Sequence, residues 1–429
     1  MNALLGRPDQ KSPGSRRLQY AFFCWINRHP NIFRFVGAVL RKWPSMGRVI
    51  PIVARKNAIK HVLSRPHSFS NNAHLKNLLA ENFQIGMDPG FTYDQDKALF
   101  DQVLKTLKPQ EVADAEAKKR IEKLKNDNVT FDLIEDYFAW VFYEVILKGF
   151  GKAASSVIGH PSGMEADEID KRRYMYEVRH VAAHLFAGSL APLKIQRRAE
   201  LCAAALRDRI DKAFFDIEKA WSDVNIKAEK SVIRRTAIGY TWVSHPVTVQ
   251  SAALAFQELM SRPKVYEELR KQAKRLGENA WCDQEFRIEV MKYVLELMRF
   301  RPTFSALARD VPRQTEFISG ANTNAQCKAG SSVTLLSIAA MFDSSETPSM
   351  DKFCPHRQWG SEEAVRDMMF GYGERQCPAK NHAVNMITSS FIGLLLLGRL
   401  QWADKWGEKI QYDGPMISRM RMKLSESSK

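Results

Sequence analysis

The segment that most constrains this chain is residues 370–380, FGYGERQCPAK, where a cysteine stands in a glycine-containing loop directly before an apolar helix. Gly371 and Gly373 permit positive backbone dihedrals and close backbone approach, so amide groups can gather around the sulfur of Cys377. The helix expected to begin near Pro378 adds partial positive charge. Both effects favour the thiolate, the form of cysteine that binds a metal or acts as a nucleophile. The alternative is an inert packing residue, as most cysteines in apolar chains are.

The order of aromatic residue, glycines, arginine and cysteine resembles the haem-binding loop of the cytochrome P450 family, F-x-x-G-x-R/H-x-C-x-G. The resemblance implies that Cys377 is the axial ligand of the iron of haem b, with electron donation that favours O–O cleavage. It also implies cofactor contacts for Phe370, Gly371 and Arg375. Ala379 stands where the family most often has glycine, which changes how closely the helix and the porphyrin can approach.

A second pattern is the pair Glu296 and Arg299, three residues apart in the helical segment MKYVLELMRF and followed by Pro302. Such pairs are common on helices and usually contribute little at the surface. Upstream of the cysteine loop, this pair resembles the family's E-x-x-R helix, which implies that the two charges are buried. The segment DKFCPHRQW resembles the family's F-x-P-x-R-W/F segment. The resemblance therefore implies that Arg357 shares the carboxylate of Glu296.

Cationic partners for the haem carboxylates are implied in two further places. Tyr93 and Lys97 match the family's His-x-x-x-Arg, and their spacing of four places them on one helical face. A phenol and an ammonium can hold a carboxylate by one hydrogen bond and one charge-assisted bond; a solvated helix face is the alternative. Arg309, in LARDV, matches an arginine that reaches a propionate, and Arg375 is the second guanidinium.

Residues 237–260 predict one long apolar helix, followed by a turn and a charged helix. This helix resembles the one that crosses the distal face of the haem in the family. The family's small-Gly-x-acid-Thr segment falls at 243–247, where this chain has VSHPV. Neither the carboxylate nor the threonine is at its expected place, although in other members this acid–alcohol pair delivers protons during dioxygen activation.

Four substitutes for that pair are conceivable: His245, Ser244, Thr248 or a group on the substrate. We prefer His245, because imidazole can supply a proton near neutral pH and can pair with an anionic substrate. Family members that use hydrogen peroxide directly carry Arg-Pro near this place, which His245-Pro246 resembles. Pro246 removes an amide and predicts a kink. The alternative for His245 is a core histidine with a backbone partner.

The formal net charge of +16 over 429 residues predicts an acidic partner, either a nucleic acid, an anionic lipid or an electron donor. The chain has no nucleic-acid-binding motif and no basic run interleaved with aromatic residues, so a nucleic acid is not expected. We expect an acidic ferredoxin or a flavodoxin-type donor. The alternative is a generally basic, solvated surface.

The six cysteines show no C-x-x-C spacing, which predicts neither a zinc site nor a disulfide framework and fits a reducing cytoplasm. His180 and His184 are one helical turn apart but have no evident third ligand, so packing or pocket lining is expected. No apolar segment reaches the roughly 20 residues that span a bilayer. We therefore expect a soluble, cytoplasmic protein of bacterial type without a membrane anchor.

The resemblance implies a mainly α cytochrome P450 fold, a triangular helical prism with a small β-rich region. Haem is expected between the long central helix and the helix after the cysteine loop. We expect residues 1–429 to form a single catalytic domain, with 1–16 a loose basic tail, 49–53 a short strand and 109–230 almost wholly helical.

The expected function is insertion of an oxygen atom from O2 into a small apolar organic substrate, with electrons from an external partner. One alternative is an enzyme that uses peroxide or rearranges a hydroperoxide. The second alternative is a haem-binding protein without turnover.

Overall fold

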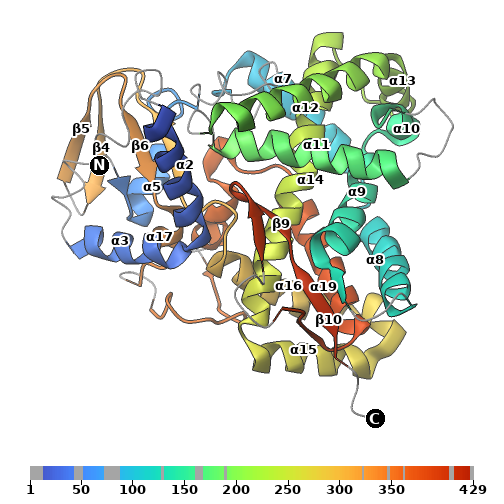
Figure 1. The fold of residues 1–429 in the computed structure, drawn as a ribbon. Helices are drawn as coiled ribbons and strands as arrows, with labels where there is room; N and C mark the ends of the chain where they lie inside the picture. The colour runs from blue at the N-terminus through green and yellow to red at the C-terminus, as the bar shows by residue number, and fades with distance from the viewer. Residues whose placement is uncertain are drawn as a thin grey trace.

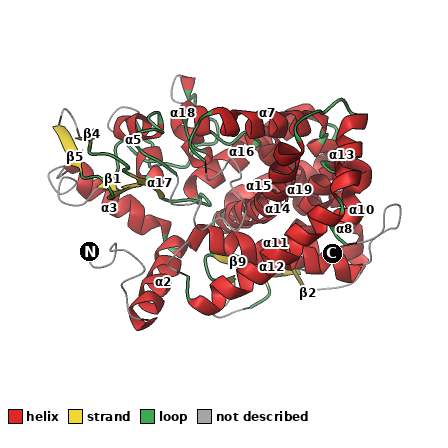
Figure 2. Cartoon of the chain, turned by 90° about the horizontal axis from the view of Figure 1, so that it is seen from above, coloured by secondary structure: helices red, strands yellow, loops and turns green. Residues whose placement is uncertain are grey.

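The computed structural model describes residues 13–42, 52–71, 87–126, 130–159, 168–187, 191–320, 323–344, 348–360, 363–404 and 410–425. Helices dominate, and the strands form small separate sheets (Figures 1 and 2). The expected mainly α fold with a small β-rich region is confirmed. No helix within these ranges combines the length and apolarity needed to cross a membrane.

The helical elements are α2 (Pro13–Arg28), α3 (Pro30–Lys42), α5 (Lys56–Leu63), α7 (Phe91–Thr106), α8 (Pro109–Asn126), η3 (Leu133–Phe138), α9 (Ala139–Lys148), η4 (Gly151–Ala153), α10 (Ala154–Val157), α11 (Glu168–Ala187), α12 (Leu193–Lys212), α13 (Phe214–Asp223), α14 (Lys230–Met260), α15 (Pro263–Leu276), η6 (Gly277–Trp281), α16 (Gln284–Phe300), α17 (Ser337–Met341), α18 (Glu363–Arg366), η8 (Asp367–Phe370), η9 (Gly373–Arg375) and α19 (Lys380–Leu397). The expected, almost wholly helical stretch 109–230 is confirmed where it is described, apart from the short strand Thr130–Asp132.

The strands are β1 (Ile52–Val53), β2 (Thr130–Asp132), β3 (Leu307–Asp310), β4 (Thr315–Gly320), β5 (Thr323–Cys327), β6 (Ser332–Leu335), β7 (Leu400–Trp402), β8 (Gln411–Asp413), β9 (Met416–Arg419) and β10 (Arg421–Leu424). They pair as β1-β6-β3, β2-β10-β7, β4-β5 and β8-β9. In the first sheet β1 is parallel to β6, with Val53 opposite Leu335, and β3 is antiparallel to β6.

Helix α14 lies at the centre of the helical part, where it packs against α7, α9, α11, α16 and α19 (Figure 1). Its residues are apolar on nearly every side, so the helix is buried rather than amphipathic. The long helix predicted over 237–260 is confirmed and begins earlier, at Lys230. Pro246, which has no amide hydrogen to donate, lies inside this helix and does not end it.

A second, smaller core joins the β1-β6-β3 sheet to α5 and α17, on the same side of the molecule as α3 (Figure 1). The strand expected at 49–53 is described only at 52–53, where it is confirmed as β1. The loose tail expected at 1–16 is wrong for residues 13–16, which open α2. The remainder of that tail lies outside the described residues.

Candidate functional site

The cysteine loop is held in a tight conformation by its own backbone. The Cys377 amide donates to the Phe370 carbonyl at 2.7 Å, and the Gln376 amide donates to the Gly373 carbonyl at 3.0 Å. Gly371 has φ +87°, and a Cβ there would lie 3.1 Å from the carbonyl oxygen of Arg375. A side chain at that position would therefore be strained in both conformation and space.

The pKa of the Cys377 thiol is shifted in the opposite direction to that expected from the loop alone. Burial raises its pKa to about 11, and a bond from the backbone of Ala379 opposes this only in part. Desolvation thus outweighs the nearby amides and the start of α19. A thiolate at this position needs a cation to compensate for the lost solvation, which fits an iron ligand better than a free nucleophile.

Tyr93 and Lys97 reach the cysteine loop from α7. The Tyr93 hydroxyl donates to the carbonyl of Glu374 at 2.9 Å, and the Lys97 ammonium donates to the same oxygen at 3.3 Å. Tyr93 is buried, and burial raises the pKa of its phenol. The two residues share one helical face, as expected, and both lie beside the loop that carries Cys377.

Two guanidinium groups converge next to the same loop. Arg375 forms an ion pair with Asp88 at 3.1 Å, and Arg309 donates to the carbonyl of its neighbour Ala308 at 2.7 Å. Burial, together with the charge of Arg375, lowers the pKa of Arg309 to about 10. Two half-buried cations close to one carboxylate favour a further anion, and the paired carboxylates of a porphyrin fit this requirement.

Asp88 was missed in the sequence. Its carboxylate also accepts from the hydroxyl of Ser70 and from the amide of Asn71, the latter at 2.8 Å. In the sequence, Asp88 is recognisable only as an aspartate in a turn before Pro89. That position predicts a hydrogen bond to the local backbone, not an ion pair with an arginine far along the chain.

One face of α14 keeps exposed surface in the middle of an otherwise buried helix. Val243, Ser244 and Val247 are each partly exposed, and their spacing places them on one side. One turn further, the Ser251 hydroxyl is 2.6 Å from that of Thr303, which precedes the strand carrying Arg309. This side therefore faces the segment that leads to the arginine cluster.

The other two proton-donor candidates lie differently. The Thr248 hydroxyl donates to the Ser244 carbonyl at 2.7 Å and is thus bound to its own helix. His245 is only 3% exposed, and its Nε2 lies 2.8 Å from the carbonyl of Ala139 on α9, away from the Val243–Val247 side. Burial lowers the pKa of His245 to about 4. This geometry favours the alternative, a core histidine, and leaves Ser244 as the candidate on the partly exposed face.

The burial of His245 predicts a pH-dependent stability. Its pKa falls from 6.5 to about 4 on folding. Below about pH 6.5 the unfolded chain therefore binds a proton at this imidazole, whereas the folded protein binds it only near pH 4. The free energy of unfolding thus decreases as the pH falls through this window. Between pH 7.5 and 4.5, wild type should lose about 3 kcal/mol more unfolding free energy than His245→Gln, measured in urea. Equal losses would show that this imidazole does not titrate differently on folding.

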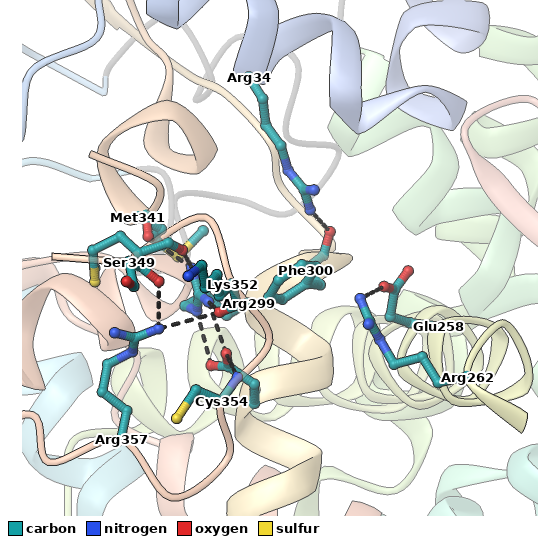
Figure 3. Close-up of polar contacts among 12 residues, drawn as sticks. Arg34, Glu258, Arg262, Arg299, Phe300, Met341, Ser349, Lys352, Cys354 and Arg357 are labelled. Carbon is teal, nitrogen blue, oxygen red and sulfur yellow. Dashed lines mark hydrogen bonds and ion pairs between the residues drawn. The ribbon is translucent and has the colours of Figure 1, made fainter. Parts of the chain in front are cut away.

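The Glu296–Arg299 pair is buried on α16, as the resemblance implied. Arg299 donates to both carboxylate oxygens of Glu296, at 2.7 and 2.8 Å, and is fully buried. It also donates to the carbonyls of Met341 and Met350 (Figure 3). The amide of Cys354 donates to Glu296 at 2.8 Å. This pair thus ties α16 to the segment that leads into the cysteine loop.

Arg357 has different partners from those expected. Its guanidinium donates to the carbonyls of Ser349 and Lys352 (Figure 3) and also to that of Pro348. Within the described residues, no hydrogen bond joins it to the carboxylate of Glu296. The Lys352 carbonyl also accepts from Arg299 at 3.2 Å. Arg357 therefore joins the cluster through a shared backbone oxygen, because the Cys354 amide takes the place expected for it on the carboxylate.

His180 and His184 line the packed face of α11. His180 is buried, lies 3.3 Å from the carboxylate of Asp413 and has its pKa lowered to about 4 by burial. Burial also lowers the pKa of His184. In the described part of the chain, no three histidine, cysteine or acidic side chains are grouped as metal ligands. The packing role expected for both histidines agrees with this placement.

A family model described as cytochrome P450 matches residues 173–418. No curated protein matches the chain. Among solved structures, P450BioI in complex with an acyl carrier protein ligated by hexadec-9Z-enoic acid aligns with TM-score 0.65 and 15% identity, covering 90% of this chain and 98% of that one. Open EryK from S. erythraea aligns with TM-score 0.66 and 15% identity over 91% and 97%.

A third solved structure, CYP109B1 from Bacillus subtilis, aligns with TM-score 0.60 and 17% identity over 90% and 99% of the two chains. At these identities the likeness to solved structures establishes the fold. The residues matched by the family model include α14, the Glu296–Arg299 pair and the cysteine loop.

Proposed function

The chain belongs to the cytochrome P450 family, and on this basis we propose that it binds haem b through Cys377 and inserts an oxygen atom from O2 into a small apolar organic substrate. The observation that carries the proposal is the convergence of three groups. These are the Cys377 thiol, the Arg309–Arg375 cations, and the Tyr93–Lys97 pair bound to Glu374.

The protein groups have separate tasks in this proposal. Cys377 ligates the iron, and Arg309 and Arg375 bind the two propionates by charge-assisted hydrogen bonds. When bound, haem supplies the oxidising chemistry. Val243 and Val247 provide an apolar wall that excludes water from the substrate side, and the Ser244 hydroxyl holds a proton on that same face.

An acidic ferredoxin or flavodoxin-type protein is the proposed electron donor. Lys60 lies 5.7 Å from the ring of Tyr372 in the cysteine loop, and Lys97 binds the loop at Glu374. The end of α5 adjoins Gly373, where an added Cβ would lie 4.0 Å from the Cα of Ser64, so the exposed Arg65 lies near it. These cations, and the net charge of +16, favour attraction of a negatively charged partner.

A second candidate function is use of hydrogen peroxide in place of O2 and reductant. The observation that favours it is the absence of an acid–alcohol pair at 243–247, where the one imidazole faces α9 instead. Without a positioned acid, proton delivery during dioxygen activation is weakened, and peroxide already carries those protons and electrons.

The test is turnover of the purified protein with a panel of lipids, acids, terpenoids and macrocycles, chosen by spin-state shifts of the haem band. We expect product with O2, an acidic ferredoxin and its reductase. Product with hydrogen peroxide alone, and none with the ferredoxin system, would select the second candidate. Consumption of neither reductant nor peroxide with any bound ligand would contradict both and leave a haem-binding protein without turnover.

A further inference from the structure

A pocket of about 360 Å³ lies on the other side of α14 from Val243, Ser244 and Val247. It is bounded by η3, α9, α11, α14 and β9, and α14 contacts each of the other four. Figure 1 shows α9, α11 and β9 around α14. Cys377 does not line it. Protein interiors hold few voids of this size, whereas ligand pockets begin at about 300 Å³.

The walls of the pocket are mainly apolar. The side chains of Ile134, Met175, Pro246, Val249, Met416 and Ile417 line it. Ile169, which is 69% exposed, lies at its edge on α11 and marks where it opens to solvent. An apolar body can therefore enter from the α11 side and be removed from water.

His245 supplies a buried hydrogen-bond acceptor in this pocket. A carbonyl oxygen only accepts, so the Nε2 that faces Ala139 carries the proton, and the ring is neutral at pH 7. Nδ1 is then a bare lone pair, and it has no partner among the described residues. Such an atom costs free energy unless a donor, such as a hydroxyl group, meets it.

Arginines on α11 supply hydrogen-bond donors and positive charge in the same pocket. Arg172, Arg173 and Arg179 all line the pocket, against one lining carboxylate, Glu135. Arg179 donates to Glu135 through one terminal nitrogen at 3.2 Å, while its buried Nε has no partner within the described ranges. The charge of Arg179 contributes to the lowered pKa of His245, so the two groups lie close together.

We propose that this pocket is a second ligand site, which binds an aliphatic carboxylic acid that carries a hydroxyl group close to its carboxylate. The carboxylate accepts from Arg179, the aliphatic chain packs between α14 and β9, and the hydroxyl donates to Nδ1 of His245. The site does not depend on the proposed function, because none of its lining residues belongs to the cysteine loop or the arginine cluster.

The test is calorimetric titration of the full haem-loaded chain with 3-hydroxydecanoic acid, whose hydroxyl lies close to its carboxylate, with imidazole present to occupy the haem site. We expect one equivalent to bind. Arg179→Gln should weaken binding about tenfold, as loss of one charge-assisted hydrogen bond would. His245→Phe should remove the preference, about fivefold, for 3-hydroxydecanoic over decanoic acid. Arg197→Gln, at an exposed arginine of α12 outside the pocket, should bind like wild type.

Val249→Trp should fill the pocket and abolish binding. Because that variant could fail to fold, Ile169→Glu at the exposed edge provides a second block by charge repulsion. The proposal would be overturned if imidazole competed with the acid, if the heat of titration did not saturate, or if the pocket variants bound the acid like wild type. It would also be overturned if the acid did not bind at all, as expected for a pocket that holds only water. Failure of haem binding would be distinguishable from failure of this proposal. In that case imidazole would not shift the haem band, while the acid would still bind.

Discussion

Glu296→Ala is expected to lower the free energy of unfolding by about 3–5 kcal/mol, because Arg299 would become a buried charge without a counterion. The Cys354 amide would lose its acceptor at the same time. The loss is a large part of the stability of an ordinary domain, about 5–15 kcal/mol. The segment before the cysteine loop would loosen, so we also expect the purified variant to retain little haem.

The measurement is urea unfolding, together with haem content per chain. Glu258→Ala is the matched control, since Glu258 also pairs with an arginine three to four residues away on a helix, Arg262, at 2.6 Å (Figure 3). That pair is partly exposed, and its loss should cost about 0–1 kcal/mol. Wild-type stability and full haem in Glu296→Ala would show that the buried pair does not support the cofactor loop.

Cys377→Ser is expected to remove thiolate ligation, and with it the red-shifted band of the reduced carbon monoxide adduct. Turnover should fall below about 1% of wild type, because a serine hydroxyl does not donate electron density as a thiolate does. The fold should persist, since the two side chains are nearly the same size. Difference spectroscopy and product formation measure the two effects.

The control for that substitution is Cys282→Ser, at an exposed cysteine between α15 and α16 that lies outside the cysteine loop. It should match wild type in spectrum and turnover. Retention of the red-shifted band by Cys377→Ser would mean that a different sulfur ligates the iron. Loss of turnover in both variants would point to a general effect of removing thiols.

The parts of the site that could be predicted from sequence depend on short spacings. Gly371 and Cys377 lie in one tight loop, and Glu296 and Arg299 lie on one helical turn, so local geometry fixes their mutual positions. The long apolar segment ending at Met260 could only be a buried helix, and α14 is one. These elements could be predicted without knowing which segments pack around them.

Other positions depended on which element packs against which. The periodicity of α14 separates His245 from Val243 and Val247, but only the fold shows that α9 lies on the His245 side. The partners of Arg357 differ from the expected carboxylate for a similar reason, because the amide of Cys354 donates to Glu296 where Arg357 was expected. Every residue has the same backbone amide and carbonyl groups, so a pattern of side chains does not show which of these groups will bind a given carboxylate.

The family-type cysteine loop, the pairing of Glu296 with Arg299 and the long central helix can be recognised in the amino-acid order, because each depends on residues that lie close together in the chain. The raised pKa of Cys377, the lowered pKa of His245, the pairing of Asp88 with Arg375 and the pocket behind α14 follow instead from the packing of the folded chain. Burial and charge at those places come from segments far apart in the chain, and desolvation is a property of the assembled surroundings.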